Sequence, residues 1–312
     1  MDDTPRARAV RPVMIYNPVA GRARAGLFRA CLAALEAGGC APTVRATRGP
    51  GEARALACAA AVEGADLVIA AGGDGTIGEI VNGLAGTRVP LAIVPLGTAN
   101  VLAREIGLDP KPAAVARAIL AGGVRAVCLG RLRGHGGPAR LFVQMAGAGF
   151  DAHVVAGVNL GLKRLVGKGA YVAASLWRFA VFPFPTYRVT VDGAEYQAAS
   201  VVVANGRHYG GPYTCAPDAR LEQPCFHVGL FMCPGALAAA RYAGALARGT
   251  LATRADYRLI TGRRVAIDGP PGDPVQADGD VAARLPVEIE IMPAALDLMV
   301  PRGALGPGRS VP

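Results

Sequence analysis

Residues 66–76 read DLVIAAGGDGT, an apolar run that ends in a glycine-rich turn with one acidic residue. The run from Asp66 to Ala71 predicts a buried strand, and a helix is expected to begin near Thr76. Glycine at such a junction permits positive φ and lets backbone amides approach a ligand without interference from Cβ. Because the start of a helix adds unsatisfied amides and a partial positive charge, this turn is a candidate anion-binding site.

Acidic residues accompany this first turn. Asp74 would stand beside bound phosphate, where a carboxylate makes chemical sense if a divalent cation, a ribose or a phosphoryl proton lies between them. Thr76 and Glu79 are three residues apart, the spacing of a capping box that would fix the helix start. Short glycine motifs also occur without any ligand, so the turn alone leaves open an ordinary strand-to-helix junction.

A second glycine turn follows in the stretch 91–100, LAIVPLGTAN. Leu91 to Val94 predicts a strand, and Ala99 to Ile106 predicts a helix. Consecutive βα units in a parallel sheet usually lie side by side, so both glycine turns would open at the same edge of the sheet. Thr98 and Asn100 would add a hydroxyl and an amide that can orient phosphate or ribose. Two such turns at one edge favour a nucleotide site.

The remainder of the first 122 residues continues the same alternation of strands and helices. Strands are expected at Val13–Tyr16 and Val44–Thr47, and helices at Leu27–Ala37 and Glu52–Val62. A third turn, from Asn17 to Gly21 with Arg22 and Arg24 behind it, would open at the same edge. It could hold a phosphate or form a solvated basic loop. The pattern predicts an α/β N-terminal nucleotide-binding domain with a parallel sheet, over residues 1–125.

The second half of the chain has a different pattern, with many short strands separated by Gly, Pro and Asp turns. It predicts an antiparallel β-sandwich C-terminal domain over residues 126–293. The main helices expected in this half are Gly169–Phe182 and Gly235–Ala247. The tail, residues 294–312, is expected to add a strand to one domain, with packing against the N-terminal domain as one option. The expected strands are Val124–Arg133, Arg140–Ala146, Tyr187–Val191, Ser200–Val203, His227–Met232, Tyr257–Ile260, Arg264–Ile267 and Pro286–Ile291.

Composition limits the classes of partner. The 312 residues carry 33 Lys and Arg against 23 Asp and Glu, a formal net charge of +10. That excess favours acidic partners such as nucleotides or anionic lipid surfaces, although an Arg-rich composition can also reflect the host genome. Nucleic acid is disfavoured because the basic residues are dispersed and no platform of aromatic and basic residues occurs.

Location follows from cysteine usage and hydropathy. Seven cysteines without a CxxC pair favour a reduced, cytoplasmic protein. No stretch supplies about 20 apolar residues, so any membrane contact is expected to be peripheral and transient. The basic residues Lys163, Arg164 and Lys168 precede an aromatic and aliphatic stretch. They could favour an anionic lipid surface or form an ordinary solvated loop.

Several motifs in order resemble one known family. Asn17-Pro18 with Gly21, Thr47 followed by Gly51-Glu52-Ala53, Gly72 to Thr76 with Glu79, and Pro95 to Asn100 are similar to the signature of the diacylglycerol kinase catalytic family. That family includes bacterial soluble lipid kinases, sphingosine kinases and ceramide kinases, and is distantly related to NAD kinases. Weaker matches continue through the C-terminal half, as in Gly147-Ala148-Gly149-Phe150-Asp151, Ala204-Asn205-Gly206 and Asp278-Gly279-Asp280.

The resemblance implies ATP and Mg²⁺ as cofactors and a lipid with a free hydroxyl as substrate. It also implies a general base at Asp280, where the family has the last residue of an Asp-Gly-Glu turn, with Asp278 as the fallback. Without the resemblance, this turn would be read as a β-hairpin with solvated carboxylates. The nucleotide-binding candidates are Asn17, Thr47, Gly72, Gly73, Asp74, Gly75, Thr76, Glu79, Gly97, Thr98 and Asn100, of which Asp74 would meet the metal through Mg-ATP.

The sequence departs from the family pattern in two places. Gln223-Pro224 stands where bacterial relatives often have a metal-binding Asp-Gly, so a structural cation site is expected to be weak or lost unless Glu222 substitutes. Gly78 stands where relatives commonly have Asn.

These observations together predict an ATP-dependent lipid kinase, with diacylglycerol as the leading substrate and sphingoid bases or ceramide as others. An NAD kinase-like enzyme is the nearest alternative, and the motif from Pro95 to Asn100 argues against it. A non-catalytic module that binds nucleotide or lipid is the alternative from another class. A homodimer is left open.

Overall fold

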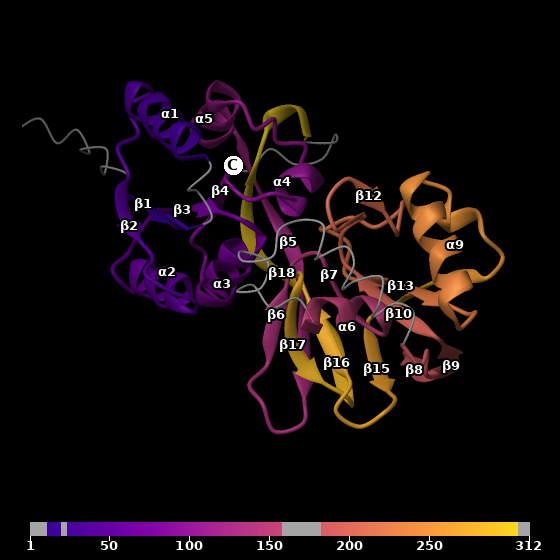
Figure 1. The fold of residues 1–312 in the computed structure, drawn as a ribbon. Helices are drawn as coiled ribbons and strands as arrows, with labels where there is room; N and C mark the ends of the chain where they lie inside the picture. The colour runs from indigo at the N-terminus through magenta and orange to yellow at the C-terminus, as the bar shows by residue number, and fades with distance from the viewer. Residues whose placement is uncertain (1–10, 20–23, 158–181, 305–312) are drawn as a thin grey trace, which may run out of the picture. The chain divides into compact units, whose positions relative to one another are not determined.

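The structure is a computed structural model that describes residues 11–19, 24–157 and 182–304 (Figure 1). Contacts within the chain divide it into two compact units, which are described separately. The first comprises Met1–Ala126 and Leu296–Pro312, and the second comprises Val127–Ala295. The expected helix at Gly169–Phe182 falls almost entirely outside the described residues, as do Lys163, Arg164 and Lys168 and, in the third turn, Gly21 and Arg22.

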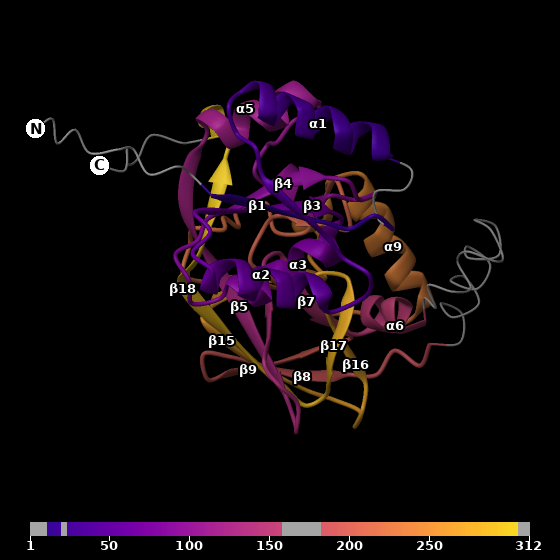
Figure 2. The same ribbon diagram turned by 90° about the vertical axis from the view of Figure 1, so that its left-hand side faces the viewer.

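The first unit contains a parallel sheet in which β1 pairs with β2 and β3, and β3 pairs with β4. Near the end of the chain, Leu298 pairs with Leu91 in a parallel bridge. Figure 2 shows α1 and α5 on one face of the sheet and α2 and α3 on the other. The α/β class expected from the sequence is confirmed. The elements are β1 (Pro12–Tyr16), α1 (Ala25–Ala37), β2 (Thr43–Ala46), α2 (Glu52–Val62), β3 (Leu67–Gly72), α3 (Asp74–Leu84), β4 (Leu91–Pro95), α4 (Val101–Glu105), α5 (Pro112–Ala121) and η3 (Arg302–Ala304).

Burial explains why the central strands are apolar on both faces. All six residues of β3 and all five of β4 are buried, as expected for parallel strands covered by helices on each side. The edge strand β2 has no fully buried residue and contains Arg45. The most apolar runs therefore occupy the middle of the sheet, and the glycine turns follow them directly.

The capping box predicted at Thr76 is wrong. Helix α3 begins at Asp74, with Gly73 as its N-cap and no side-chain cap. The hydroxyl of Thr76 instead accepts a hydrogen bond from Asn17 Nδ2 at 3.0 Å. Glu79 reaches another helix, where its carboxylate accepts hydrogen bonds from the amides of Gly51 and Ala53 at the start of α2. Partners distant in sequence therefore override the local capping rule.

The second unit is a β-sandwich that also carries the helices α6 and α9 and the short helix η2. One sheet has the strand order β14-β13-β10-β7-β16-β17, and every pair in it is antiparallel. In the facing layer, β15 pairs antiparallel with β18 and β8, and β8 pairs antiparallel with β9. The elements are β5 (Gly123–Gly134), β6 (Arg140–Phe142), β7 (Met145–Ala148), α6 (Phe150–Gly157), β8 (Tyr187–Val191), β9 (Ala194–Ala198), β10 (Ser200–Ala204), β11 (His208–Tyr209), β12 (Tyr213–Thr214), β13 (Phe226–Phe231), α9 (Ala236–Ala247), η2 (Leu251–Thr253), β14 (Tyr257–Gly262), β15 (Arg264–Asp268), β16 (Pro274–Ala277), β17 (Asp280–Arg284) and β18 (Val287–Val300).

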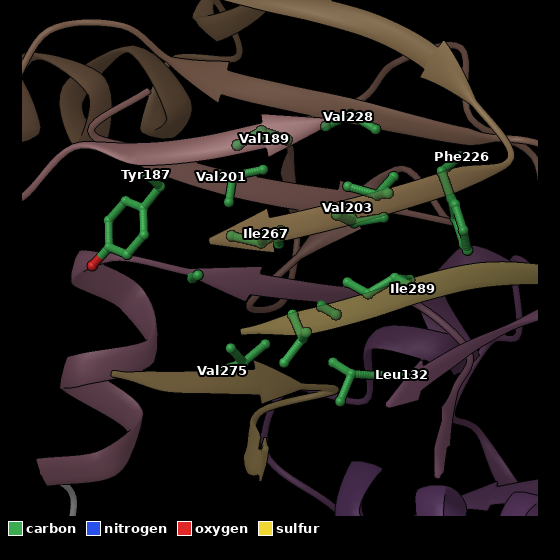
Figure 3. Close-up of a cluster of buried hydrophobic side chains, with 14 of the residues drawn as sticks. Leu132, Tyr187, Val189, Val201, Val203, Phe226, Val228, Ile267, Val275 and Ile289 are labelled. Atoms are coloured by element: carbon green, nitrogen blue, oxygen red, sulfur yellow. The ribbon is translucent and has the colours of Figure 1, made fainter. Parts of the chain in front are cut away.

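The core of the sandwich is formed by branched aliphatic side chains from both layers. Figure 3 shows Val201, Val203 and Val228 of one sheet facing Val189 and Ile267 of the other. Successive strand residues point to opposite faces of a sheet, so Val201 and Val203 of β10 enter this cluster whereas Val202 packs in a second buried cluster. The antiparallel sandwich predicted from the turn-rich second half is confirmed.

Two strand predictions in this half differ from the structure. The stretch Arg140–Ala146 forms two strands, β6 and β7, because the amides at Val143 and Gln144 bond to the side chain of Asp278 instead of a neighbouring strand. The expected strand at Pro286–Ile291 is longer than predicted, because β18 continues through Pro293 to Val300.

Candidate functional site

The two glycine turns of the first unit lie against each other. Leu96 donates its amide to the carbonyl of Gly72 at 2.9 Å, which joins the ends of β3 and β4. A Cβ on Gly97 would lie 2.6 Å from the Cα of Gly73, and one on Gly73 would lie 3.2 Å from the Cα of Gly97. No larger residue fits at Gly97 without moving the backbone of the other turn. The expectation that both turns open at one edge of the sheet is confirmed.

Asp74 ties the first turn to the helix that follows the second. Its carboxylate accepts hydrogen bonds from the amides of Asn100 and Val101, at 3.0 and 2.7 Å. Val101 is the first residue of α4, so Asp74 caps that helix from a distant part of the chain. Burial raises the pKa of Asp74, and the bonds from the backbone amides partly oppose that rise.

Further polar side chains surround the turns. The side chains of Asn17, at the end of β1, and Thr76, in the first turn of α3, are hydrogen-bonded to each other. Thr47 follows β2, is buried and donates its amide to the carbonyl of Tyr16. Thr98 is exposed in the second turn. These candidates therefore stand where parallel strands end, which is the edge at which open α/β sheets bind ligands.

Asn100 has a feature that the sequence did not reveal. It adopts a left-handed backbone conformation with φ of 48°, and its Nδ2 donates to the carbonyl of Gly97 at 2.8 Å. Its Oδ1 is buried and has no hydrogen-bond partner within the described part of the chain. A buried acceptor without a partner is costly, so this atom suits a donor supplied by a ligand or by water.

The edge also carries a positive charge. The guanidinium of Arg24 donates to the carbonyl of Pro95, at 3.4 Å, directly before the second turn. The amides at the start of α3 add the partial positive charge of a helix N-terminus. Gly73 and Gly97 allow the two turns to lie in contact, which brings these amides beside the second turn. This arrangement can bind a polyphosphate.

Metal-binding groups are sparse in the described residues. No group of three or more His, Cys, Asp or Glu side chains in these ranges could hold a metal ion. Glu222 and Gln223 are exposed, in a turn where Gln223 donates its amide to the carbonyl of Arg220. The single carboxylate of Asp74 would be enough for a Mg²⁺ ion that arrives bound to phosphates, because Mg²⁺ usually takes one or two carboxylates and keeps several waters.

The acidic turn of the second unit lies in the hairpin between β16 and β17. Asp278 and Gly279 both have positive φ, 49° and 87°, as in a two-residue turn of type I′. The carboxylate of Asp278 accepts hydrogen bonds from three backbone amides, those of Val143, Gln144 and Met145, at 2.7, 2.9 and 3.0 Å. Asp278 therefore holds the segment between β6 and β7 in place.

Asp280 differs sharply from Asp278. Its side chain is 52% exposed and, among the described residues, its carboxylate contacts only Arg140 Nη2, at 3.0 Å. An exposed ion pair of this kind is weak and opens readily. Of the two acidic candidates, Asp280 has the carboxylate that can accept a proton without releasing backbone amides.

Beside this turn lie buried polar groups to which the sequence gave no role. Both side-chain polar atoms of Gln144 and the Oδ1 of Asn205 are buried without hydrogen-bond partners in the described ranges. Asn205 Nδ2 donates to the carbonyls of Cys128 and Val143. A polar residue inside an otherwise apolar strand pattern is the signal that could have identified Gln144.

Comparisons with known proteins match the two halves of the chain to two known domains. Residues 11–132 match the diacylglycerol kinase catalytic domain, and residues 144–300 match the YegS C-terminal NAD kinase beta sandwich-like domain. A diacylglycerol kinase of Mycobacterium tuberculosis is 33% identical over 256 residues, which cover 80% of this chain and 82% of that protein. A probable lipid kinase, YegS-like, of Pseudomonas aeruginosa is 30% identical over 280 residues, which cover 88% of this chain and 90% of the relative.

Solved structures share the fold. The crystal structure of a putative diacylglycerol kinase from Bacillus anthracis superimposes with a TM-score of 0.78 at 23% identity, covering 98% of this chain and all of that chain. In the part of the chain that the structure describes, no helix is both long and apolar enough to cross a membrane.

Proposed function

Because the chain belongs to the diacylglycerol kinase family of lipid kinases, which transfer phosphate to an alcohol group, we propose that it phosphorylates the hydroxyl of diacylglycerol with ATP. The observation that carries the ATP half is the close approach of the two glycine turns at one edge of the sheet, where a Cβ on Gly97 would lie 2.6 Å from the Cα of Gly73. The lipid half is supported by the names of the relatives.

The nucleotide would be held mainly by backbone groups. The amides at the start of α3 face the expected position of the phosphates, and the helix dipole favours their negative charge. Thr98 and the Oδ1 of Asn100, which has no partner among the described residues, would bind hydroxyl or amino groups of the nucleoside. Asn17, Thr47, Thr76 and Glu79 hold the ends of the strands and helices that form this edge.

Asp280 would accept the proton of the lipid hydroxyl. As the hydroxyl oxygen attacks the γ-phosphorus, the bond from that phosphorus to the bridging oxygen of ADP breaks, and the proton passes to the carboxylate. Mg²⁺ on the phosphates, with Asp74 as the nearest candidate ligand, would neutralise part of their charge when bound. The lipid would be met at a membrane surface.

A test of acceptors separates this proposal from its alternatives. Purified protein is supplied with ATP and, in separate reactions, diacylglycerol, sphinganine, ceramide or NAD, and ADP release is measured. We expect release above background with diacylglycerol. Release with NAD alone would establish the NAD kinase-like alternative. Tight ATP binding without any acceptor-dependent release would establish a binding module.

A further inference from the structure

The stretch Ala204-Asn205-Gly206, at the end of β10, has no part in the chemistry described above. Asn205 is only 1% exposed, although its side chain is polar. Its Nδ2 donates one hydrogen bond to the carbonyl of Cys128 on β5, at 2.8 Å, and another to the carbonyl of Val143, at 2.7 Å. A buried amide with two such bonds fixes the segments that it joins, because leaving either carbonyl without a donor would be costly.

The segment that Asn205 holds is the connection between β6 and β7, residues 143–145, which we call the strap. The carbonyl of Gln144 accepts hydrogen bonds from the backbone amides of Asn205 and Gly206, at 2.8 and 3.1 Å. The carbonyl of Val143 accepts the bond from the side chain of Asn205. Asn205 therefore bonds to two of the three carbonyls of the strap.

The remaining polar groups of the strap are bonded to the acidic turn. All three of its amides donate to the carboxylate of Asp278, and the carbonyl of Met145 accepts a bond from the amide of Asp278 at 2.9 Å. Asp280 stands two residues after Asp278, at the start of β17. The strap thus lies between Asn205 on one side and the turn that carries Asp280 on the other, and each of its backbone amides and carbonyls is hydrogen-bonded.

We propose that Asn205 is a positioning residue for phosphoryl transfer, which acts through the strap to fix the turn that carries the carboxylate of Asp280. The inference rests on the proposed function, in which Asp280 accepts the proton of the lipid hydroxyl. Asp280 cannot fix the turn itself, because its carboxylate contacts only Arg140 among the described residues, in an exposed ion pair. A displacement of about 1 Å at a catalytic group can cost roughly 100-fold in rate, so the strap has a kinetic consequence.

A matched pair of variants separates this role from stability alone. Asn205→Ala removes the donor from the carbonyls of Cys128 and Val143, so kcat with diacylglycerol should fall by about 10- to 100-fold. KM for ATP should not change, because the glycine turns belong to the other unit. Val203→Ala is the control, since Val203 is buried on the same strand and its side chain makes apolar contacts only. It should lower the melting temperature and leave kcat unchanged.

The sharpest test places the substitution in a chain that lacks the base. If Asn205 acts through Asp280, Asn205→Ala should lower kcat only slightly in the Asp280→Ala background, because no carboxylate is left to misplace. Single-turnover reactions with γ-³²P-labelled ATP and diacylglycerol measure the residual rate. An equal fold-loss in both backgrounds would show that Asn205 acts on the fold as a whole, and would overturn the proposal.

Hydrogen exchange reads the strap without any need for catalysis. In peptides that cover residues 143–145, deuterium uptake followed by mass spectrometry should be faster in Asn205→Ala, as in Asp278→Ala. It should stay slow in Val203→Ala and in Asp280→Ala. Unchanged uptake in Asn205→Ala would also overturn the proposal. If Asn205→Ala does not fold, Asn205→Ser, which keeps one hydroxyl donor at this position, replaces it in each measurement.

The outcomes separate this inference from the proposed function. A wild-type protein that phosphorylates no lipid would refute the kinase activity, and faster exchange in Asn205→Ala would then still show that Asn205 holds the strap. A wild-type protein that phosphorylates diacylglycerol, with full kcat in Asn205→Ala, would overturn the positioning role alone.

Discussion

The glycine turn of the first unit holds one aspartate that is bonded to backbone amides, whereas the hairpin turn of the second holds one aspartate of this kind and one that is not. Asp74 and Asp278 each accept hydrogen bonds from backbone amides that are distant in sequence, and so hold segments of the chain together. Asp280 holds no backbone group among the described residues and is half-exposed. An aspartate in a motif can therefore hold backbone segments together or leave its carboxylate open to a substrate. The hydrogen bonds of the carboxylate indicate which of these two roles it can play.

The largest effect is expected from removing the exposed carboxylate. Asp280→Ala should lower kcat by about 10²- to 10⁴-fold, the usual contribution of a general base. The melting temperature should hardly change, because an exposed ion pair with Arg140 adds little stability. Steady-state kinetics with diacylglycerol and a thermal melt test both statements. Asp280→Glu should recover much of the activity, and near-normal turnover by Asp280→Asn would place the base elsewhere.

At the other end of the same turn, the main effect is expected on stability. Asp278→Ala leaves three backbone amides without their acceptor, and each unsatisfied group costs about 1–3 kcal/mol when buried. Because the site is only partly buried, we expect the free energy of unfolding to fall by about 2–4 kcal/mol. Urea titration measures it. Asp278→Asn keeps one acceptor oxygen and tolerates positive φ, so its loss should be smaller. Equal stability of the Asp278→Ala and Asp280→Ala variants would remove the distinction between the two residues.

Separating the glycine turns should weaken nucleotide binding. A Cβ at Gly97 meets backbone at 2.6 Å, so Gly97→Ala forces the turns apart. Overpacking of this kind costs about 1–3 kcal/mol of stability, and because the displaced turns carry the proposed phosphate site, we expect KM for ATP to rise. Gly26→Ala in α1 is the control, since nothing lies within 4 Å of its added Cβ. An unchanged KM for ATP in Gly97→Ala would show that phosphate binds elsewhere.

A smaller effect should appear in the pH dependence of stability. Burial raises the pKa of Asp74 above its ordinary value of 3.8, so the folded chain binds this proton more tightly than the unfolded chain. The contribution of Asp74 to stability therefore falls as pH rises from 3.8 through the folded pKa. The stability advantage of the wild type over Asp74→Asn, measured by urea titration, should narrow as pH increases. An advantage that widens would mean that the amide hydrogen bonds outweigh burial.

The smallest effect is expected at Gly78, inside α3. A Cβ there meets nothing within 4 Å. Gly78→Ala should stabilise the protein by about 0.4–1 kcal/mol, because alanine loses less backbone entropy in a helix. Activity should be unchanged. A loss of stability in the thermal melt would show that the helix has less room than the structure indicates.

The sequence was sufficient to predict the strands and helices whose positions depend on the local pattern of apolar residues. Buried runs such as Leu67–Ala71 and Leu91–Val94 identified central strands, and the glycines that follow indicated the edge at which we propose that nucleotide binds. The boundary of α3 was missed because Thr76 and Glu79 bond to Asn17 and to the start of α2 rather than to each other.

The candidate site could be predicted from the types of residue at the strand ends, but its contacts between distant residues could not. Hydroxyls, amides and glycines at strand ends indicated a nucleotide. The sequence could not show that Asp278 binds the amides of residues 143–145, because those residues are more than 130 positions away. For the same reason the break between β6 and β7 became visible only in the folded chain, as did the side-chain amide of Gln144, which has no partner in the described ranges.

Transfer of phosphate itself tests the central claim most directly. The wild-type protein and Asp280→Ala are incubated with γ-³²P-labelled ATP, Mg²⁺ and diacylglycerol in mixed micelles, and the extracted lipids are separated by thin-layer chromatography. We predict labelled phosphatidic acid from the wild type and almost none from the variant. No labelled lipid from the wild type with diacylglycerol, a sphingoid base or ceramide would contradict the assignment as a lipid kinase.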